Sequence, residues 1–131
     1  MMAAESNLQT LIKSMKPVLN HGNYVFCTVD KLDTIAIQDI VSFFREEEGY
    51  TIVMPKDEAD RLKIEYSYVA AWITLTVHSS LNAVGLTAAF SNALAAQGIS
   101  CNVIAGFHHD HIFVAIEDAQ KAMVVLQALA A

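Results

Sequence analysis

Two parts of this chain repeat the same order of sequence features, and this internal repeat constrains the fold more than any other feature. Residues 24–54 align with residues 73–103 without a gap, so that YVFCTVD stands opposite ITLTVHS. Each part begins and ends with an apolar run typical of a strand, and between the runs lie apolar residues at helical spacing followed by a glycine. These glycines, Gly49 and Gly98, occupy the position at which helices commonly end. The repeat therefore predicts two copies of a β-α-β unit.

The spacing of apolar residues also predicts elements outside the two copies. Helices are expected at residues 7–15, 35–47, 84–96 and 117–129, with one helical turn at 56–61. Strands are expected at residues 24–29, 50–54, 62–66, 69–78, 99–105 and 112–116. A short polar loop containing Gly106 joins the last two strands, so a hairpin and antiparallel sheets are expected. The predicted fold class is α+β: two ferredoxin-like halves, residues 1–66 and 67–131, with helices on one face of each sheet.

The composition excludes several classes of protein. Of the 131 residues, 54% are hydrophobic and 17% are charged, so a folded core is expected, and the surplus of apolar surface favours a homodimer. A formal net charge of −6 without any Lys/Arg cluster argues against nucleic acid as a partner. No apolar run is long enough to span a bilayer, and the first residues lack the pattern of a secretion signal. With two cysteines far apart in sequence, these features predict a cytoplasmic protein without membrane contact.

The second copy resembles a known regulatory module. Residues 72–122, WITLTVHSSLNAVGLTAAFSNALAAQGISCNVIAGFHHDHIFVAIEDAQKA, resemble an ACT domain, a small βαββαβ module that binds amino acids in regulatory proteins. Residues 44–60, FREEEGYTIVMPKDEAD, are similar to the N-terminal half of a bacterial family of short tandem-ACT proteins, and the resemblance covers essentially the whole chain. More distantly, the pairing of two divergent halves is similar to amino-acid-sensing ACT proteins of animals. The resemblance implies a non-enzymatic regulatory protein whose partner is a free amino acid or a similar small zwitterion.

The resemblance also leaves one structural question open. A complete ACT domain has a fourth strand after its second helix, whereas here Ala131 follows the predicted helix directly. Either the two halves share strands or the fourth strand is missing.

The segment between the first strand and the helix of the second copy is the candidate ligand site. In ACT domains this loop, with a glycine near the helix start, is where ligands are most often held. A helix start presents unpaired N–H groups and a partial positive charge, which suit an α-carboxylate. The predicted ligand-binding residues are Ser79, Ser80, Leu81, Asn82, Val84, Gly85, Leu86, Asn102 and Ile104, with Asn102 assigned to the ammonium group. In the structural alternative, Ser80 or Asn82 only caps the helix, and Gly85 only makes room for packing.

The run His108-His109-Asp110-His111 is the most polar feature of the second half, and it predicts a contact with a ligand or partner. Two alternatives stay open: a metal site at this run, or a solvated turn. No cofactor is expected. The sequence contains no GxSxG, P-loop, GxGxxG or HExxH motif, so an enzyme is not expected. The alternative function is a structural interaction module that forms oligomers without a ligand.

Overall fold

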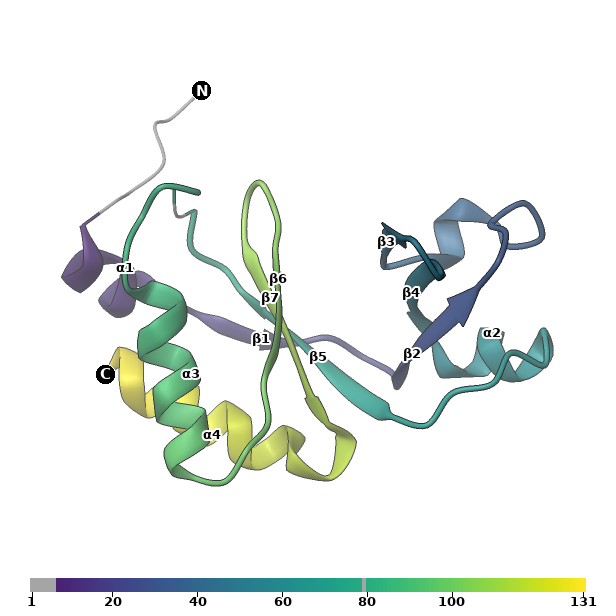
Figure 1. Ribbon diagram of the computed structural model, residues 1–131. Helices are drawn as coiled ribbons and strands as arrows, with labels where there is room; N and C mark the ends of the chain where they lie inside the picture. The colour runs from purple at the N-terminus through teal and green to yellow at the C-terminus, as the bar shows by residue number, and fades with distance from the viewer. Residues whose placement is uncertain (1–6, 79) are drawn as a thin grey trace. The chain divides into compact units, whose positions relative to one another are not determined.

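The computed structural model describes residues 7–78 and 80–131 (Figure 1). The chain divides into two compact units: the larger comprises the described residues of Met1–Asn20 together with those of Ala71–Ala131, and the smaller comprises His21–Ala70. These units follow contacts in space. The predicted domain boundary between residues 66 and 67 concerns the two sequence copies, and it stays a prediction.

The larger unit contains strands in the order β1-β5-β7-β6 together with three helices (Figure 1). Its strands are β1 (Pro17–Leu19), β5 (Val69–Leu75), β6 (Asn102–Ala105) and β7 (Asp110–Ala115). Its helices are α1 (Leu8–Ser14), α3 (Leu86–Ala96) and α4 (Ala119–Ala130), the last preceded by a 3-10 turn, η2 (Ile116–Asp118). The β1–β5 and β6–β7 pairs are antiparallel, as the predicted hairpin requires.

Strand β1 supplies the fourth strand of the larger unit. Pro17, Val18 and Leu19 pair with Leu75, Thr74 and Ile73 of β5. A proline lacks a backbone N–H, and it is tolerated here because β1 has a partner on one side only within this unit. The fourth strand therefore comes from the N-terminal segment, a strand that the sequence pattern did not predict.

The smaller unit contains β2 (Tyr24–Val29), β3 (Ser42–Glu46), β4 (Gly49–Pro55), the 3-10 turn η1 (Ile37–Asp39) and helix α2 (Lys56–Arg61). The strands of this unit lie in the order β5-β2-β4-β3, which corresponds to β1-β5-β7-β6 of the larger unit, and the 3-10 turn η1 takes the place of α3. Strand β2 pairs with β4 along its whole length, and its first two residues pair with Val69 and Ala70 of β5. The first two residues of β5 thus pair with β2 as the fourth strand of the smaller unit, and the remaining residues of β5 belong to the larger unit. The predicted ferredoxin-like fold is confirmed, and of the two alternatives for the fourth strand, sharing between the halves is the one that the structure shows.

Two predicted elements of the first copy are wrong. Residues 35–47 do not form a helix, because Ser42–Glu46 pairs with β4 as an antiparallel hairpin and only η1 is helical. Residues 62–66 do not form a strand. The alternating apolar residues of this segment follow the end of α2. There Lys63 adopts a left-handed conformation (φ 58°), and the Ile64 N–H donates to Ala59 O (2.9 Å).

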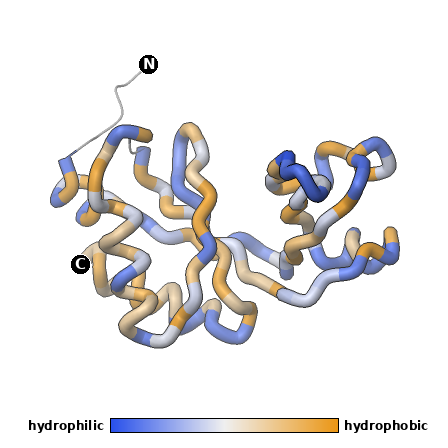
Figure 2. Tube along the Cα trace, viewed as in Figure 1, coloured by the Kyte–Doolittle hydropathy of each residue, from blue (hydrophilic) through white to orange (hydrophobic). Residues whose placement is uncertain are grey.

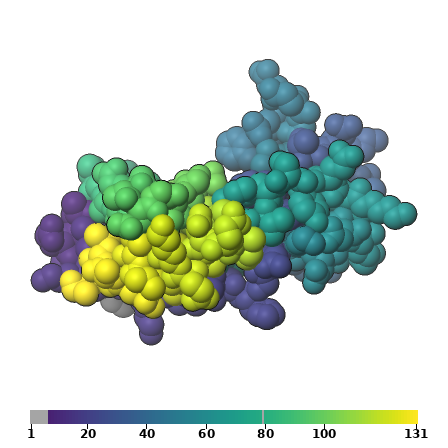
Figure 3. Space-filling view, turned by 90° about the horizontal axis from the view of Figure 1, so that it is seen from below, coloured from purple at the N-terminus to yellow at the C-terminus, as the bar shows by residue number. Residues whose placement is uncertain are grey.

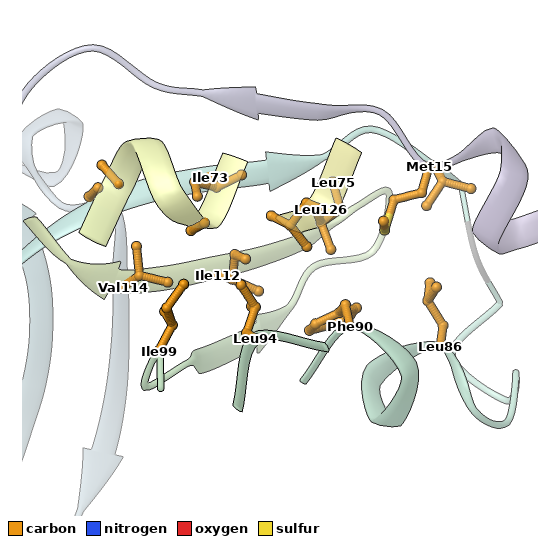
Figure 4. Packing of buried hydrophobic residues seen from close by; sticks show 14 of the residues in the cluster. Met15, Ile73, Leu75, Leu86, Phe90, Leu94, Ile99, Ile112, Val114 and Leu126 are labelled. Carbon is orange, nitrogen blue, oxygen red and sulfur yellow. The ribbon is translucent and has the colours of Figure 1, made fainter. Parts of the chain in front are cut away.

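The core of the larger unit lies between its sheet and its helices (Figure 4). Alternate residues of β5 and β7 face the helices because successive side chains of a strand point to opposite faces. The fully buried side chains include Ile73, Leu75, Ile112 and Val114 from the sheet and Phe90, Leu94 and Leu126 from the helices. This packing fixes where α3 begins relative to the β6–β7 hairpin.

Candidate functional site

A small pocket lies in the larger unit where the segment before α3 approaches the ends of β6 and β7. Its volume is about 130 Å³. The lining residues are Ser80, Leu81, Ala83, Gly85, Leu86 and Thr87 from the segment and helix start, and Ala105 and Asp110 from the hairpin. Ala105 and Asp110 are paired residues at the ends of their strands. The structure thus brings together the predicted loop and one residue of the predicted polar run.

The start of α3 has no side-chain cap among the described residues. Helix α3 begins at Leu86, its N-cap is Gly85, and no described side chain accepts a hydrogen bond from the first turn. The hydroxyl of Ser80 instead accepts from the N–H of Asn82 (3.1 Å). Uncapped N–H groups and the partial positive charge of the helix start favour an anionic group at this position. Capping by Ser80 or Asn82, the alternative hypothesis, is not what the structure shows.

Gly85 combines a backbone role with a packing role. Its φ of +104° lies in the left-handed region that side chains rarely adopt. A Cβ at this position would also lie 2.9 Å from Cδ2 of Leu8 on α1. The glycine therefore permits both the turn into α3 and the close packing of α1 beside it.

Asp110 brings a carboxylate into the pocket. It is 8% exposed, and among the described residues it is the one polar or charged residue that is buried. No described group donates a hydrogen bond to its carboxylate or forms an ion pair with it. Burial raises the pKa of Asp110, and the neighbouring His111 opposes that rise. Because this side chain is largely withdrawn from water, a ligand that supplies a donor or a positive charge would stabilise its carboxylate.

The other predicted site residues lie outside the pocket lining. Asn82 and Val84 are exposed, the latter at 84%. Asn102 pairs with Phe113 at the end of β6 remote from Ala105, and Ile104 pairs with His111. Ser79 lies outside the described residues.

Three lining residues were not predicted: Ala83, Thr87 and Ala105. The apolar spacing predicts a helix from residue 84, whereas α3 begins at Leu86. With the correct start, Thr87 would have fallen in the first turn, which lines the pocket. Ala105 had no signal in the sequence, since its place in the pocket depends on the hairpin register.

His108 and His111 of the polar run contact different residues. Figure 2 shows this run as a hydrophilic stretch of the β6–β7 hairpin. The indole N–H of Trp72 donates to Nδ1 of His111 (3.0 Å), and Oγ1 of Thr74 lies 3.2 Å from the same nitrogen. Burial lowers the pKa of His111, with a further lowering from His109, while Asp110 opposes both. Because an indole can only donate, the lone pair of Nδ1 in His111 is already engaged.

The structure gives the metal hypothesis no support. Over residues 7–78 and 80–131, no group of three or more His, Cys, Asp and Glu side chains is arranged to hold a metal ion. The ring of His108 instead lies beside those of His78 and Phe107, with centroids 5.6 and 5.1 Å away.

The strand order and helix placement of the two units define the class of the protein: an α+β protein built from two small βαββαβ modules. Sequence profiles of the ACT domain match residues 3–71 and residues 67–128. The chain therefore belongs to the ACT domain family, with two ACT domains in tandem.

Solved structures agree with this assignment. A Vibrio cholerae protein of unknown function, described as a possible transport protein, is 49% identical, with a TM-score of 0.86 over 95% of this chain and 96% of that one. An Agrobacterium tumefaciens protein is 20% identical, with a TM-score of 0.67 over 88% of this chain and 89% of that one. The ligand-free regulatory subunit of Thermus thermophilus aspartate kinase is 11% identical, with a TM-score of 0.62 over 86% and 95%. The last two likenesses show the fold alone.

No curated protein matches the chain significantly. Within the part of the chain that the structure describes, no helix has the length and apolar character needed to cross a membrane.

Proposed function

We propose that the protein is a non-enzymatic, cytoplasmic regulator that binds a free amino acid at the pocket beside α3. One observation supports the proposal most directly: the uncapped start of α3 opens onto a pocket in an ACT unit. An α-carboxylate at this point would accept hydrogen bonds from the first-turn N–H groups and would interact favourably with the helix dipole. Membership of a family of regulatory domains supports a binding role in place of catalysis.

The residues of the predicted site enter the proposal unequally. Gly85 and Leu86 form the helix start, and Ser80 and Leu81 form the adjoining wall of the pocket. Asn102, which the sequence assigned to the ammonium group, lies at the other end of the hairpin, and the proposal does not include it.

A thermal-shift panel with the twenty amino acids at millimolar concentration tests the proposal. A ligand at 100 times its dissociation constant adds about 2.7 kcal/mol to the free energy of unfolding, which corresponds to several degrees for a chain of this size. A reproducible shift with a few amino acids supports the sensor. A flat panel would favour the alternative, an interaction module without a ligand.

The predicted homodimer also remains a proposal. Helices α3 and α4 lie side by side on the surface of the larger unit (Figure 3). Between them runs an apolar groove of about 570 Å³, lined mainly by alanine, valine and leucine. Val124 beside this groove is 64% exposed. An isologous contact between two copies of this face would remove these apolar side chains from water.

A further inference from the structure

The pocket beside α3 restricts the ligand further, and this inference rests on the proposed function. We propose that the ligand is a small amino acid of the size of glycine, alanine or serine, whose ammonium group pairs with the carboxylate of Asp110. Three properties of the pocket support this assignment: its charge, the position of its donors and its volume.

Asp110 is the charged side chain among the described residues that line the pocket. It is 8% exposed and has no hydrogen-bond or ion-pair partner among the described groups. An ammonium group would supply both a positive charge and N–H donors to this carboxylate. A ligand with a carboxylate but no amine would leave Asp110 unpaired and would add a second negative charge to a small space.

The lining also separates the two charges of a zwitterion. The start of α3, at Gly85, Leu86 and Thr87, offers backbone N–H groups for a carboxylate. Asp110 belongs to a different element, β7, and faces the same pocket. The remaining lining contributes mostly apolar contacts from residues such as Ala83 and Ala105, which suit a hydrogen atom, a methyl group or a short polar side chain.

The volume limits the size of the side chain. A cavity of about 150 Å³ is known to hold a benzene molecule, which has six non-hydrogen atoms, so the 130 Å³ found here accommodates about five such atoms. Glycine has five non-hydrogen atoms, and alanine and serine exceed that number by only one and two. Aromatic and long aliphatic amino acids exceed this volume.

The titration of Asp110 supplies an independent readout of the pairing. Burial raises the pKa of the free carboxyl group, and pairing with an ammonium group lowers it, because the partner stabilises the charged form. Binding therefore releases protons in the acidic range, and affinity falls as the pH decreases through the raised pKa. His108, His109 and His111 are the other titratable groups of this hairpin. Of these, His111 opposes the rise in the pKa of Asp110 by its charge.

Calorimetric titration of the whole chain tests the inference. The ligands are glycine, alanine and serine, compared with phenylalanine, tryptophan and propionate, the last being alanine without its amine. Alanine is expected to bind at least tenfold more tightly than propionate or phenylalanine. Asp110→Asn should weaken alanine binding at least tenfold and abolish the proton release. Asp30→Asn, at an exposed position in the smaller unit, is the matched control and should change neither.

The outcomes separate the two proposals. Equal binding of phenylalanine and alanine, equal binding of propionate and alanine, or unchanged binding by folded Asp110→Asn would overturn this inference while an amino acid still binds. No binding of any of the twenty amino acids would overturn the proposed function itself, and the inference with it. Circular dichroism of each variant shows that a loss of binding is not a loss of folding.

Discussion

Replacing Asp110 by asparagine should stabilise the ligand-free protein at neutral pH. The substitution keeps the shape of the side chain and removes the charge that burial penalises. Leaving a buried polar group without a partner costs about 1–3 kcal/mol, and a charged group costs more. The amide still lacks a partner, so only the part due to the charge is recovered. We expect a gain of about 1 kcal/mol, equivalent to a rise in Tm of roughly 3–5 °C for a chain of this length.

The pH dependence of this gain identifies its cause. Since burial raises the pKa of Asp110 above its value in the unfolded chain, the wild-type protein loses stability as the pH rises from below 3.8 through the raised pKa. The gain from Asp110→Asn should therefore be full at pH 7 and absent near pH 3, where the carboxyl group is protonated in both states. Urea denaturation followed by circular dichroism at the two pH values measures it. A variant that is less stable at pH 7 would show that the carboxylate already has a partner, and the argument for an ammonium site would fail.

Three further changes test other parts of the structure. Gly85→Ala should destabilise the protein by about 1–3 kcal/mol in thermal denaturation, because φ is +104° and the new Cβ meets Leu8; wild-type stability would contradict the left-handed turn. Trp72→Phe removes the donor to neutral His111, so NMR titration should show a higher pKa for His111, and an unchanged pKa would argue against that hydrogen bond. Val124→Glu places a charge beside the apolar groove of α3 and α4, so light scattering should show a smaller species; an unaltered dimer would place the interface elsewhere.

The strands of the second copy were predictable because packing reinforces their local pattern. Strand β5 alternates apolar residues with Trp72 and Thr74, and the structure buries one set against the helices. Residues 35–47 show the opposite case. Their apolar spacing is helical, but Phe43, Phe44 and Arg45 pair with β4, and a hairpin turn at Glu47 and Glu48 follows. A helix there would have placed Glu46, Glu47 and Glu48 at its negative end, whereas the end of β3 and the turn expose all three to water.

The sequence predicted the loop of the candidate site, but it did not predict which residue of the β6–β7 hairpin faces that loop. A glycine before an apolar helix indicated an accessible helix start, and Gly85 occupies that position. The pattern could not indicate that Asp110 would face this start while Asn102 would not, because that depends on which end of the hairpin lies beside α3. Asn102 and Asp110 lie at opposite ends of the β6–β7 hairpin, because the register pairs Asn102 with Phe113 and Ala105 with Asp110.

The pairing of β1 with β5 means that the smaller unit is an insertion in the sequence of the larger one. The chain leaves the larger unit after Asn20 and returns at Ala71. These two points are neighbours, since the Asn20 N–H donates to Trp72 O (2.9 Å) and the Asn20 amide donates to Thr74 Oγ1 (2.9 Å). A short turn could therefore replace the whole intervening segment and leave β1 beside β5. Cutting the chain between the two sequence copies would instead separate the larger unit from its own edge strand. A shortened protein that keeps the larger unit whole should therefore be cut at Asn20 and Ala71, and not between the two sequence copies.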